Sequence, residues 1–383
     1  MKRNKYSDDG VDVGEEALFS KYASTICMAS YKNSPFVQVK DLSAGNFRGP
    51  RPVSFVGLPK GFTIEATTDG IGTKGIVVDA AQAHRTAAYD LIPMTASDIT
   101  RYGGVSLMFV NALDIVSVDK KGSTVSETYK KVLKGLGDAA AQARVVVLKG
   151  ETAQMGVCVG SEITNSRTKI NWSGTMLGAY TKDKMITGST IAAGQVIIAL
   201  KENGFRCNGI SSVRKALAMK YGKTWWKNPK AKNSIRQSAA PSVLYDTYIA
   251  TLNGWFSPSF KKELQIHAVV HLSGGAIREK LANDILFPKR LSAVLDTLWD
   301  PPRSMAEWAR WRGMTDHEFY ETWNGGQGML LVVDKKDVLH CLKRAKNFGI
   351  KARVAGRIVA GTQSSVTVVS RLTKRKEVVY RPE

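Results

Sequence analysis

Short runs of β-branched residues alternate along this chain with longer segments whose apolar residues recur at helical spacing, and this alternation most constrains the fold. In the first half we expect a helix at 124–141 and strands at 62–67, 106–110, 144–148 and 170–180. After a stretch rich in Thr, Gly and Ala, the pattern begins again with strands expected at 195–200, 266–272, 329–333 and 352–358. Such alternation is typical of mixed α/β proteins. We therefore predict an α/β (α+β) fold built from two α/β halves.

The length of 383 residues is sufficient for two domains. We expect an N-terminal domain at 1–185, a C-terminal domain at 186–360 and a basic C-terminal extension at 361–383. No apolar run reaches the ~18 residues that a membrane span requires, and the opening MKRNKYSDDG does not resemble a secretory signal. The four cysteines lie far apart without a CxxC pair, which indicates neither a disulfide framework nor a zinc site. We expect a cytoplasmic protein.

Positive charge is in large excess, since 55 Lys and Arg residues against 33 Asp and Glu residues give a formal net charge of +22. It is concentrated in segment 206–236, which has no acidic residue and contains Trp225 and Trp226, and again in segment 371–381. Three interpretations remain open: a solvated surface that maintains solubility, contact with nucleic acid, or an acidic protein partner. Tryptophan rings within a basic segment are suited to stacking on bases.

The segment that most strongly indicates chemistry follows the first predicted strand and contains Asp69, Gly70, Gly72, Thr73 and Lys74. Two glycines this close together allow backbone N–H groups to approach an anion. A lysine can neutralise phosphate charge, and an aspartate can hold a divalent cation that bridges phosphate oxygens. The spacing matches neither the Walker A loop nor the GxGxxG dinucleotide motif. Phosphate binding and a plain glycine turn with a structural aspartate both remain open.

Two further acidic residues could complete a magnesium site with Asp69. Asp98 follows a segment of helical period, and Glu151 comes directly after an apolar strand. Carboxylates at strand ends are where α/β folds gather ligands, and Mg²⁺ needs only one or two of them beside substrate phosphates. Each acid taken alone is more typical of a helix cap or a solvated surface.

Other polar segments allow two interpretations each. Asn208 and Gly209 precede a predicted helix, which suits an anion site or an ordinary N-cap turn. His267 and His271 are four apart in a predicted strand and therefore on one face, where buried or hydrogen-bonded roles are favoured over metal binding. The glycine-rich run 324–329 before a strand is typical of close backbone approach.

Taken in order, these segments resemble the phosphoribosylformylglycinamidine cyclo-ligase (aminoimidazole ribonucleotide synthetase) family over nearly the whole chain. The matching segments are Gly10-Val11-Asp12, Thr68-Asp69-Gly70-Ile71-Gly72-Thr73-Lys74, His84 with Asp90-Leu91-Ile92-Pro93-Met94, Gly150-Glu151-Thr152-Ala153, Asn208-Gly209-Ile210-Ser211-Ser212, His267 to Gly275, and Asn324-Gly325-Gly326-Gln327-Gly328-Met329. Any one of these matches would be weak, but their number and order make the fold assignment specific.

The resemblance implies a two-domain fold in which the N-terminal sheet pairs across a homodimer. It implies ATP and Mg²⁺ as cofactors, and a reaction in which ATP activates a formyl amide oxygen before an amidine nitrogen closes the imidazole ring. The residues that it assigns are Asp69, Asp98 and Glu151 to metal; Asp69, Gly70, Gly72, Thr73, Lys74 and Glu151 to the nucleotide; and Asn208 and Gly209 to the substrate. We further expect His271 to bind the substrate, and Lys74, Asp98 and Arg206 to act in catalysis.

The chain departs from the family pattern near these positions. Serine replaces asparagine at Ser97, asparagine replaces aspartate at Asn111, lysine replaces glycine at Lys149, arginine replaces histidine at Arg206, and Ser242-Val243 replaces Thr-Lys or Thr-Arg. Lost acidic groups weaken attraction for Mg²⁺, whereas an arginine could bind a substrate phosphate. A second hypothesis is therefore a catalytically impaired relative that serves as a basic binding or structural component for nucleic acid or an acidic protein.

Overall fold

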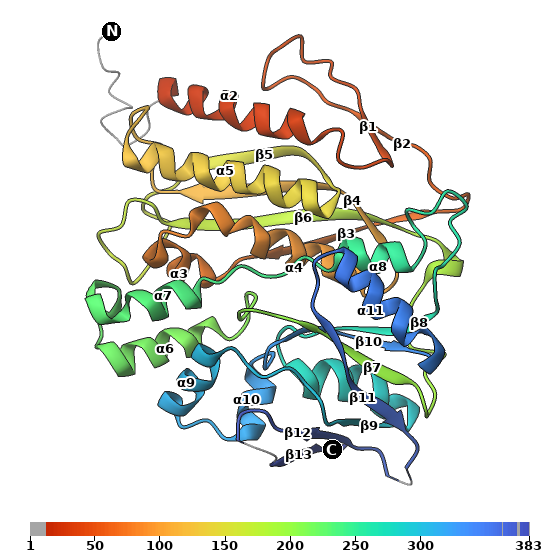
Figure 1. The fold of residues 1–383 in the computed structure, drawn as a ribbon. Coiled ribbons are helices and arrows are strands. Elements are labelled where there is room, and N and C mark those ends of the chain that lie inside the picture. The colour runs from red at the N-terminus through yellow and green to blue at the C-terminus, as the bar shows by residue number, and fades with distance from the viewer. Residues whose placement is uncertain (1–12, 362, 374–375, 383) are drawn as a thin grey trace. The chain divides into compact units, whose positions relative to one another are not determined.

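The computed structural model describes residues 13–361, 363–373 and 376–382, which form two compact units (Figure 1). The first unit combines the chain up to Ala96 with Ser106–Ala179, and the second combines Ser97–Val105 with Tyr180–Glu383. Gly10-Val11-Asp12 lies outside the described residues, as do Lys374 and Arg375 of the basic C-terminal segment. Within the described ranges, no helix is both long and apolar enough to cross a membrane.

The units differ from the predicted domains because residues 97–105 join the second unit. The carbonyl of Gly103 accepts hydrogen bonds from Asn253 Nδ2 at 2.8 Å and Trp255 Nε1 at 2.7 Å. The backbone N–H of Ile186 donates to Tyr102 O at 2.9 Å. These contacts connect positions far apart in the chain, so local sequence patterns carry no signal for them.

The first unit is built around a four-stranded sheet in the order β3-β6-β4-β5. Its strands are β3 (Thr63–Gly70), β4 (Val105–Ile115), β5 (Val146–Gln154) and β6 (Ile170–Tyr180), and β1 (Val37–Val39) and β2 (Val53–Phe55) form a separate antiparallel pair. The helices are α2 (Val13–Ser30), α3 (Lys74–Ala81), α4 (Ala88–Thr100) and α5 (Thr124–Ala143). The predicted α/β pattern of this half is therefore observed, with β6 beginning and ending at the predicted residues.

Helix α5 shows how the sequence determines an element of this unit. Ser123 caps its N-terminus by accepting a hydrogen bond from Ser126 N at 3.1 Å. The predicted apolar stripe of Val132, Leu133 and Leu136 is buried, and α5 packs on α2 and β5. Apolar residues at this spacing form one face, and burial of that face against the sheet stabilises the helix.

The second unit contains a seven-stranded sheet in the order β13-β12-β9-β11-β7-β10-β8. Its strands are β7 (Val196–Lys201), β8 (Ile266–His271), β9 (Ser292–Leu295), β10 (Gln327–Val333), β11 (Ala352–Val359), β12 (Val366–Val369) and β13 (Glu377–Tyr380). Its α-helices are α6 (Ile210–Tyr221), α7 (Lys232–Ser238), α8 (Asp246–Leu252), α9 (Arg303–Arg312), α10 (Asp316–Thr322) and α11 (Val338–Asn347), and its short helical segments are η2 (Lys182–Lys184), η3 (Trp225–Lys227), η4 (Pro229–Ala231), η5 (Arg278–Leu286), η6 (Phe287–Lys289) and η7 (Lys335–Asp337). Every residue of β10 is buried, as expected for a central strand covered on both faces.

The predicted C-terminal extension differs from the structure, because its described residues contribute two strands to this sheet. Strand β12 pairs in parallel with β9 and antiparallel with β13. The side chains of Val366 and Val368 are fully buried. Alternating valines of this kind are typical of a strand with one face on a core, so this segment belongs to the second unit.

Candidate functional site

The turn after β3 holds the predicted phosphate-binding residues in a compact arrangement. Asp69 Oδ1 accepts a hydrogen bond from the N–H of Gly70 at 2.7 Å. Gly70 lies so close to β6 that a β-carbon there would be 3.0 Å from Trp172 O. Gly72 has φ of +51°, a conformation that favours glycine, and Thr73 directly precedes α3. Gly72 and Thr73 are exposed, so this part of the turn is open to a ligand.

Lys74 does not extend to the surface, contrary to the predicted phosphate contact and catalytic role. Its side chain is fully buried, and its Nζ donates to Asp90 Oδ1 at 2.6 Å. Asp90 is itself only 1% exposed. Removing one partner from a buried pair of this kind is strongly destabilising. The structure therefore places Lys74 in the core of the first unit, where it neutralises Asp90.

A pocket of about 330 Å³ lies beside α2, α5 and β5 in the first unit, and we call it the α2–α5 pocket. Ile26, Leu133, Leu136 and Leu148 are its aliphatic lining residues, and the charged lining residues are Glu16, Arg48, Arg51, Lys149 and Glu151. A pocket that combines apolar side chains with converging polar and charged groups is a candidate small-molecule site. Of the predicted site residues, Glu151 is the one that contributes to this pocket.

Arg51 fixes the loop that borders the α2–α5 pocket. Its guanidinium donates to Phe47 O at 2.9 Å and to Ser24 Oγ at 3.4 Å, and the side chain is buried. Burial raises the pKa of Cys27 to about 11 and that of Tyr31 to about 12. Both groups are therefore neutral at pH 7 and do not offset the positive charge of the pocket.

Gly72 and Thr73 line a different pocket, about 340 Å³ in volume, that also lies in the first unit. Asp114 and Asn171 contribute to its wall and are joined by a hydrogen bond of 2.9 Å from Asn171 Nδ2 to Asp114 Oδ2. The structure thus separates the predicted nucleotide-binding residues, because Glu151 lines one pocket and the exposed part of the glycine turn lines another.

The three predicted metal ligands belong to different elements of the two units. Asp98 lies within α4, in the part grouped with the second unit, and its carboxylate is 3.5 Å from Arg101 Nε. Asp69 and Glu151 lie on β3 and β5 of the first unit, which are not adjacent strands. Among the residues that the structure describes, no group of three His, Cys, Asp or Glu side chains could hold a metal ion.

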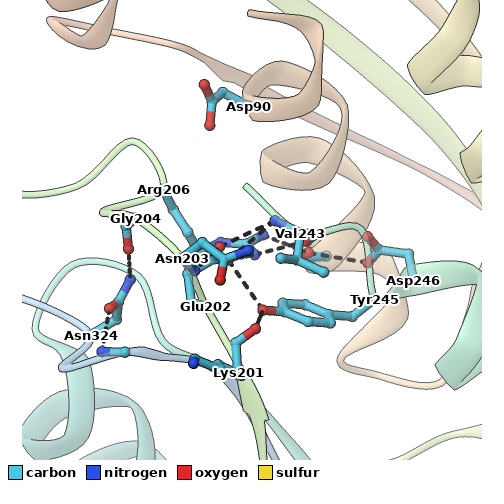
Figure 2. A network of polar contacts seen from close by, with 12 residues as sticks. Asp90, Lys201, Glu202, Asn203, Gly204, Arg206, Val243, Tyr245, Asp246 and Asn324 are labelled. Atoms are coloured by element: carbon cyan, nitrogen blue, oxygen red, sulfur yellow. Dashed lines mark hydrogen bonds and ion pairs between the residues drawn. The ribbon is translucent and has the colours of Figure 1, made fainter. Parts of the chain in front are cut away.

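Arg206 belongs to a buried polar network in the second unit (Figure 2). Its guanidinium donates to Glu202 Oε2 at 3.2 Å and to Ser97 Oγ at 3.3 Å, and both Arg206 and Glu202 are fully buried. Tyr245 donates to Lys201 O at 2.7 Å and to Glu202 at 3.2 Å. The predicted contact of Arg206 with a substrate phosphate is therefore not available in this arrangement, and its charge is balanced internally.

Asp246 extends the same network. Ser97 Oγ donates to Asp246 Oδ1 at 3.1 Å. Burial raises the pKa of Asp246 to about 6, although the nearby Arg206 opposes this change. Burial likewise raises the pKa of Tyr245 well above its usual value. The network therefore contains one carboxyl group that titrates close to neutral pH.

The predicted substrate-binding turn is held by side-chain hydrogen bonds, and one of its own donors lacks a partner. Asn324 Nδ2 donates to Gly204 O at 2.9 Å, and Trp323 Nε1 donates to Gly209 O at 3.2 Å. Gly209 has φ of +71° and lies against the ring of Trp323, where a β-carbon would not fit. Asn208 Nδ2 is buried without a hydrogen-bond partner. An unsatisfied buried donor is costly, and a ligand oxygen would satisfy it.

His267 and His271 have different surroundings, although the strand spacing predicted one shared face. The β10–β8 register shifts between Val332↔Ala268 and Val333↔Ile266, so His267 falls at an irregularity of the strand. Its ring bonds Thr190 Oγ1 at 2.8 Å and Asp334 Oδ1 at 3.1 Å. His271 is buried, and burial together with Arg206 lowers its pKa well below the usual value. His267 is therefore hydrogen-bonded and His271 is buried, and the assignment of His271 to substrate binding stays a prediction.

The sequence did not identify Arg48 and Arg51 as candidates. They lie in a loop that contains glycine and proline and has no recognised motif, and the pocket forms only when α2 and α5 pack beside β5. Three of the departures from the family pattern meet in the network, because Arg206 bonds Ser97 and also the carbonyl of Val243 at 3.4 Å.

Comparison with known proteins adds independent findings. Residues 54–179 match the family model described as AIR synthase related protein, N-terminal domain, and residues 192–369 match the model of the C-terminal domain. A protein of Methanocaldococcus jannaschii named phosphoribosylformylglycinamidine cyclo-ligase is 26% identical over 366 residues, 92% of each chain. A Staphylococcus aureus protein of the same name is 30% identical over 304 residues, 79% of this chain and 82% of the relative.

Solved structures with a similar fold have other names. The hydrogenase maturation protein HypE in complex with ATP aligns with a TM-score of 0.54 at 13% identity, over 90% of this chain and 91% of that chain. Thiamine-monophosphate kinase from Stenotrophomonas maltophilia aligns with a TM-score of 0.56 at 13% identity, over 89% of this chain and 94% of that chain. At this identity the likeness concerns the fold alone.

Proposed function

Because this chain belongs to the AIR synthase related family through both of its domains, we propose that it closes the imidazole ring of aminoimidazole ribonucleotide in an ATP-dependent reaction. The predicted family and α/β fold are confirmed by these matches. The predicted enzyme class, an ATP-dependent ligase, agrees with the names of the curated relatives. The same names favour this activity over a catalytically impaired binding component.

The proposed reaction converts formylglycinamidine ribonucleotide in two steps. The γ-phosphoryl group of ATP passes to the formyl amide oxygen, which yields ADP and a phosphorylated imidate. The amidine nitrogen then attacks the imidate carbon, the carbon–oxygen bond breaks, inorganic phosphate leaves with that oxygen, and the nitrogen loses a proton. A poor leaving group thereby becomes phosphate, and catalysis depends mainly on positioning and on stabilising the developing charge.

The α2–α5 pocket is the observation that supports nucleotide binding by the first unit. Its apolar lining from Leu133, Leu136 and Leu148 suits a purine ring, and its cationic side chains Arg48 and Lys149 suit phosphates. Glu151 would hold a Mg²⁺ ion that enters with ATP, since this ion needs only one or two carboxylates beside phosphate oxygens. When bound, the ion would offset negative charge on the phosphates.

The second unit supplies the turn that we propose for the ribonucleotide substrate. Asn208 Nδ2 lacks a partner and would donate to a substrate oxygen. Gly209 precedes the N-terminus of α6, where backbone N–H groups favour anions. We assign Arg206 to holding this turn, because its bonds to Glu202 and Ser97 fix the backbone two residues before Asn208.

A homodimer is part of the proposal. Strand β3 is one of the two edge strands of the four-stranded sheet, its residues Thr63 to Ala66 are exposed, and Ile64 is 40% exposed. An exposed apolar edge is a liability in a monomer. Pairing of this sheet with that of a second copy would cover it.

The test is incubation of the purified protein with formylglycinamidine ribonucleotide, ATP and Mg²⁺. We expect ADP release in step with aminoimidazole ribonucleotide formation. Lys149→Ala and Glu151→Gln should each lower kcat/KM by roughly 10- to 100-fold, because each removes a charge-assisted contact worth about 1.5–3 kcal/mol. Lys32→Ala, an exposed lysine of the first unit outside the pocket, is the matched control. Absence of ADP release from a folded preparation would contradict the proposal.

A further inference from the structure

The second unit carries a cationic surface that the proposed reaction does not use. It consists of eight exposed side chains on α6, α7, α9 and the segments between α6 and α7: Lys215, Lys220, Lys223, Lys227, Lys230, Lys232, Arg236 and Arg310. We call this set the basic surface. Figure 1 shows α6, α7 and α9 next to one another.

These elements form one packed group. Tyr221 of α6 has its hydroxyl 2.9 Å from Ser234 Oγ of α7, and its ring centroid is 5.8 Å from that of Trp311 on α9. Beneath the cations, Trp225, Ala231 and Ile235 are buried. The positive side chains therefore project from a single folded layer.

The basic surface carries positive charge that no ion pair among the described residues balances. In the described structure none of its eight side chains forms an ion pair, and residues 203–245 contain no acidic residue. Other cations of the second unit are paired, as Arg344 is with Glu263 and Arg357 is with Asp296 at 2.8 Å. Clustered like charges repel one another, and an anionic partner would relieve this repulsion.

Aromatic side chains within the basic surface indicate which anionic partner fits. Trp226 and Trp311 are half-buried, and Lys220 Nζ lies 5.6 Å from the ring centroid of Trp311. Lysines beside accessible rings are the combination that binds unpaired nucleotides, since the cations contact phosphates and the rings stack on bases. A duplex hides its base faces, and an acidic peptide has no flat base to stack.

From this arrangement we propose that the basic surface binds single-stranded nucleic acid through its phosphate backbone and bases. The contact is independent of base sequence, because the surface offers lysine ammonium groups and ring faces instead of a groove-reading element. Arg371 is not part of it, since its Nε is paired with Asp300 Oδ1 at 2.8 Å.

The test is fluorescence anisotropy of the full chain with labelled single strands of about 20 nucleotides, as DNA and as RNA, across a salt series. We expect the single strands to bind. The logarithm of the association constant should fall linearly with the logarithm of the salt concentration, with a slope of about −0.7 for each phosphate neutralised. The joint variant Lys215→Ala, Lys220→Ala, Lys227→Ala and Lys230→Ala should lose at least about tenfold in affinity and reduce the slope by up to about 3.

The matched control removes four exposed lysines of the first unit, Lys21→Ala, Lys32→Ala, Lys40→Ala and Lys60→Ala, with the same change in net charge. It should change affinity much less than the joint variant does. Trp226→Ala should weaken binding about 5- to 100-fold without changing the slope, the effect expected for loss of one stacked base.

Four results would each overturn the proposal. The first three are no binding at low salt, an equal loss in the control and the joint variant, and tighter binding to a blunt duplex of the same length. The fourth is competition by polyglutamate as strong as that by the single strand, because it would identify an acidic protein partner instead.

Discussion

Asp246 and His271 are both buried in the second unit, and burial moves their pKa values in opposite directions. The pKa of Asp246 rises to about 6, and that of His271 falls well below its usual range, helped by the charge of Arg206. In both cases a low-polarity environment disfavours the charged form. Each residue therefore makes the stability of this unit depend on pH, with opposite sign.

For Asp246 the affected range runs from its ordinary pKa of 3.8 to about 6. In this range the folded state retains a proton that the unfolded state has lost, so the free energy of unfolding falls as pH rises. The total loss is about 3 kcal/mol at 1.36 kcal/mol per pKa unit. The Asp246→Asn variant should lack this pH-dependent loss. Urea unfolding at pH 4 and at pH 7.5 measures the free energy of unfolding of the variant and of the wild type. An unchanged difference between the two pH values would contradict the buried, titrating carboxyl group.

His271 makes the free energy of unfolding depend on pH in the direction opposite to that of Asp246. Below its ordinary pKa of 6.5 the unfolded chain binds a proton that the folded chain does not, so stability falls as pH decreases through 6.5. His271→Gln should remove this contribution and flatten the fall between pH 6.5 and 5. The same urea measurement checks it, and His317→Gln, at an exposed histidine of the same unit, is the control. A parallel pH profile in the wild type and the His271 variant would refute the assignment.

At the scale of elements, β12 is the strand that most changes the expected organisation. Val368 is fully buried in it, whereas Val354 of β11, in the same sheet, is 40% exposed. Val368→Ala should lower the free energy of unfolding by about 2–3 kcal/mol through lost apolar burial and a residual cavity. Val354→Ala should lower it by less than about 1 kcal/mol. Equal effects in urea unfolding would show that the C-terminal segment does not belong to the core.

The elements that could be predicted from the sequence are those whose burial pattern is local. Long periodic segments such as α5 and β6 were predicted closely, because their pattern of burial is local. Helix α8 begins at Asp246, although a proline such as Pro241 is typical of a helix start, since the N–H of Val243 is bonded to Glu202 at 3.2 Å. Contacts of this kind join distant positions and leave no local signal.

In the candidate site, too, features set by local backbone geometry could be predicted, and contacts between distant residues could not. The turn at Gly72 and the turn at Asn208 were found from glycine patterns, which report local backbone geometry. The burial of Lys74 against Asp90 and of Arg206 against Glu202 was not found, because a lone charged residue in a motif is equally compatible with a ligand and with an internal partner. Pocket residues such as Arg48 became visible only once α2 and α5 were packed.

For the whole molecule, the open edge of the first unit's sheet leads to a prediction about assembly. Light scattering should give a mass of twice 41.8 kDa at micromolar concentration. Ile64→Lys places a charge on the exposed edge strand β3, where it would be desolvated on pairing, and should yield monomers. Leu339→Lys, at a position 81% exposed in the second unit, should leave the dimer intact. A monomeric wild-type protein would exclude sheet pairing, and equal dissociation of both variants would show that added charge, and not the β3 edge, controls the mass.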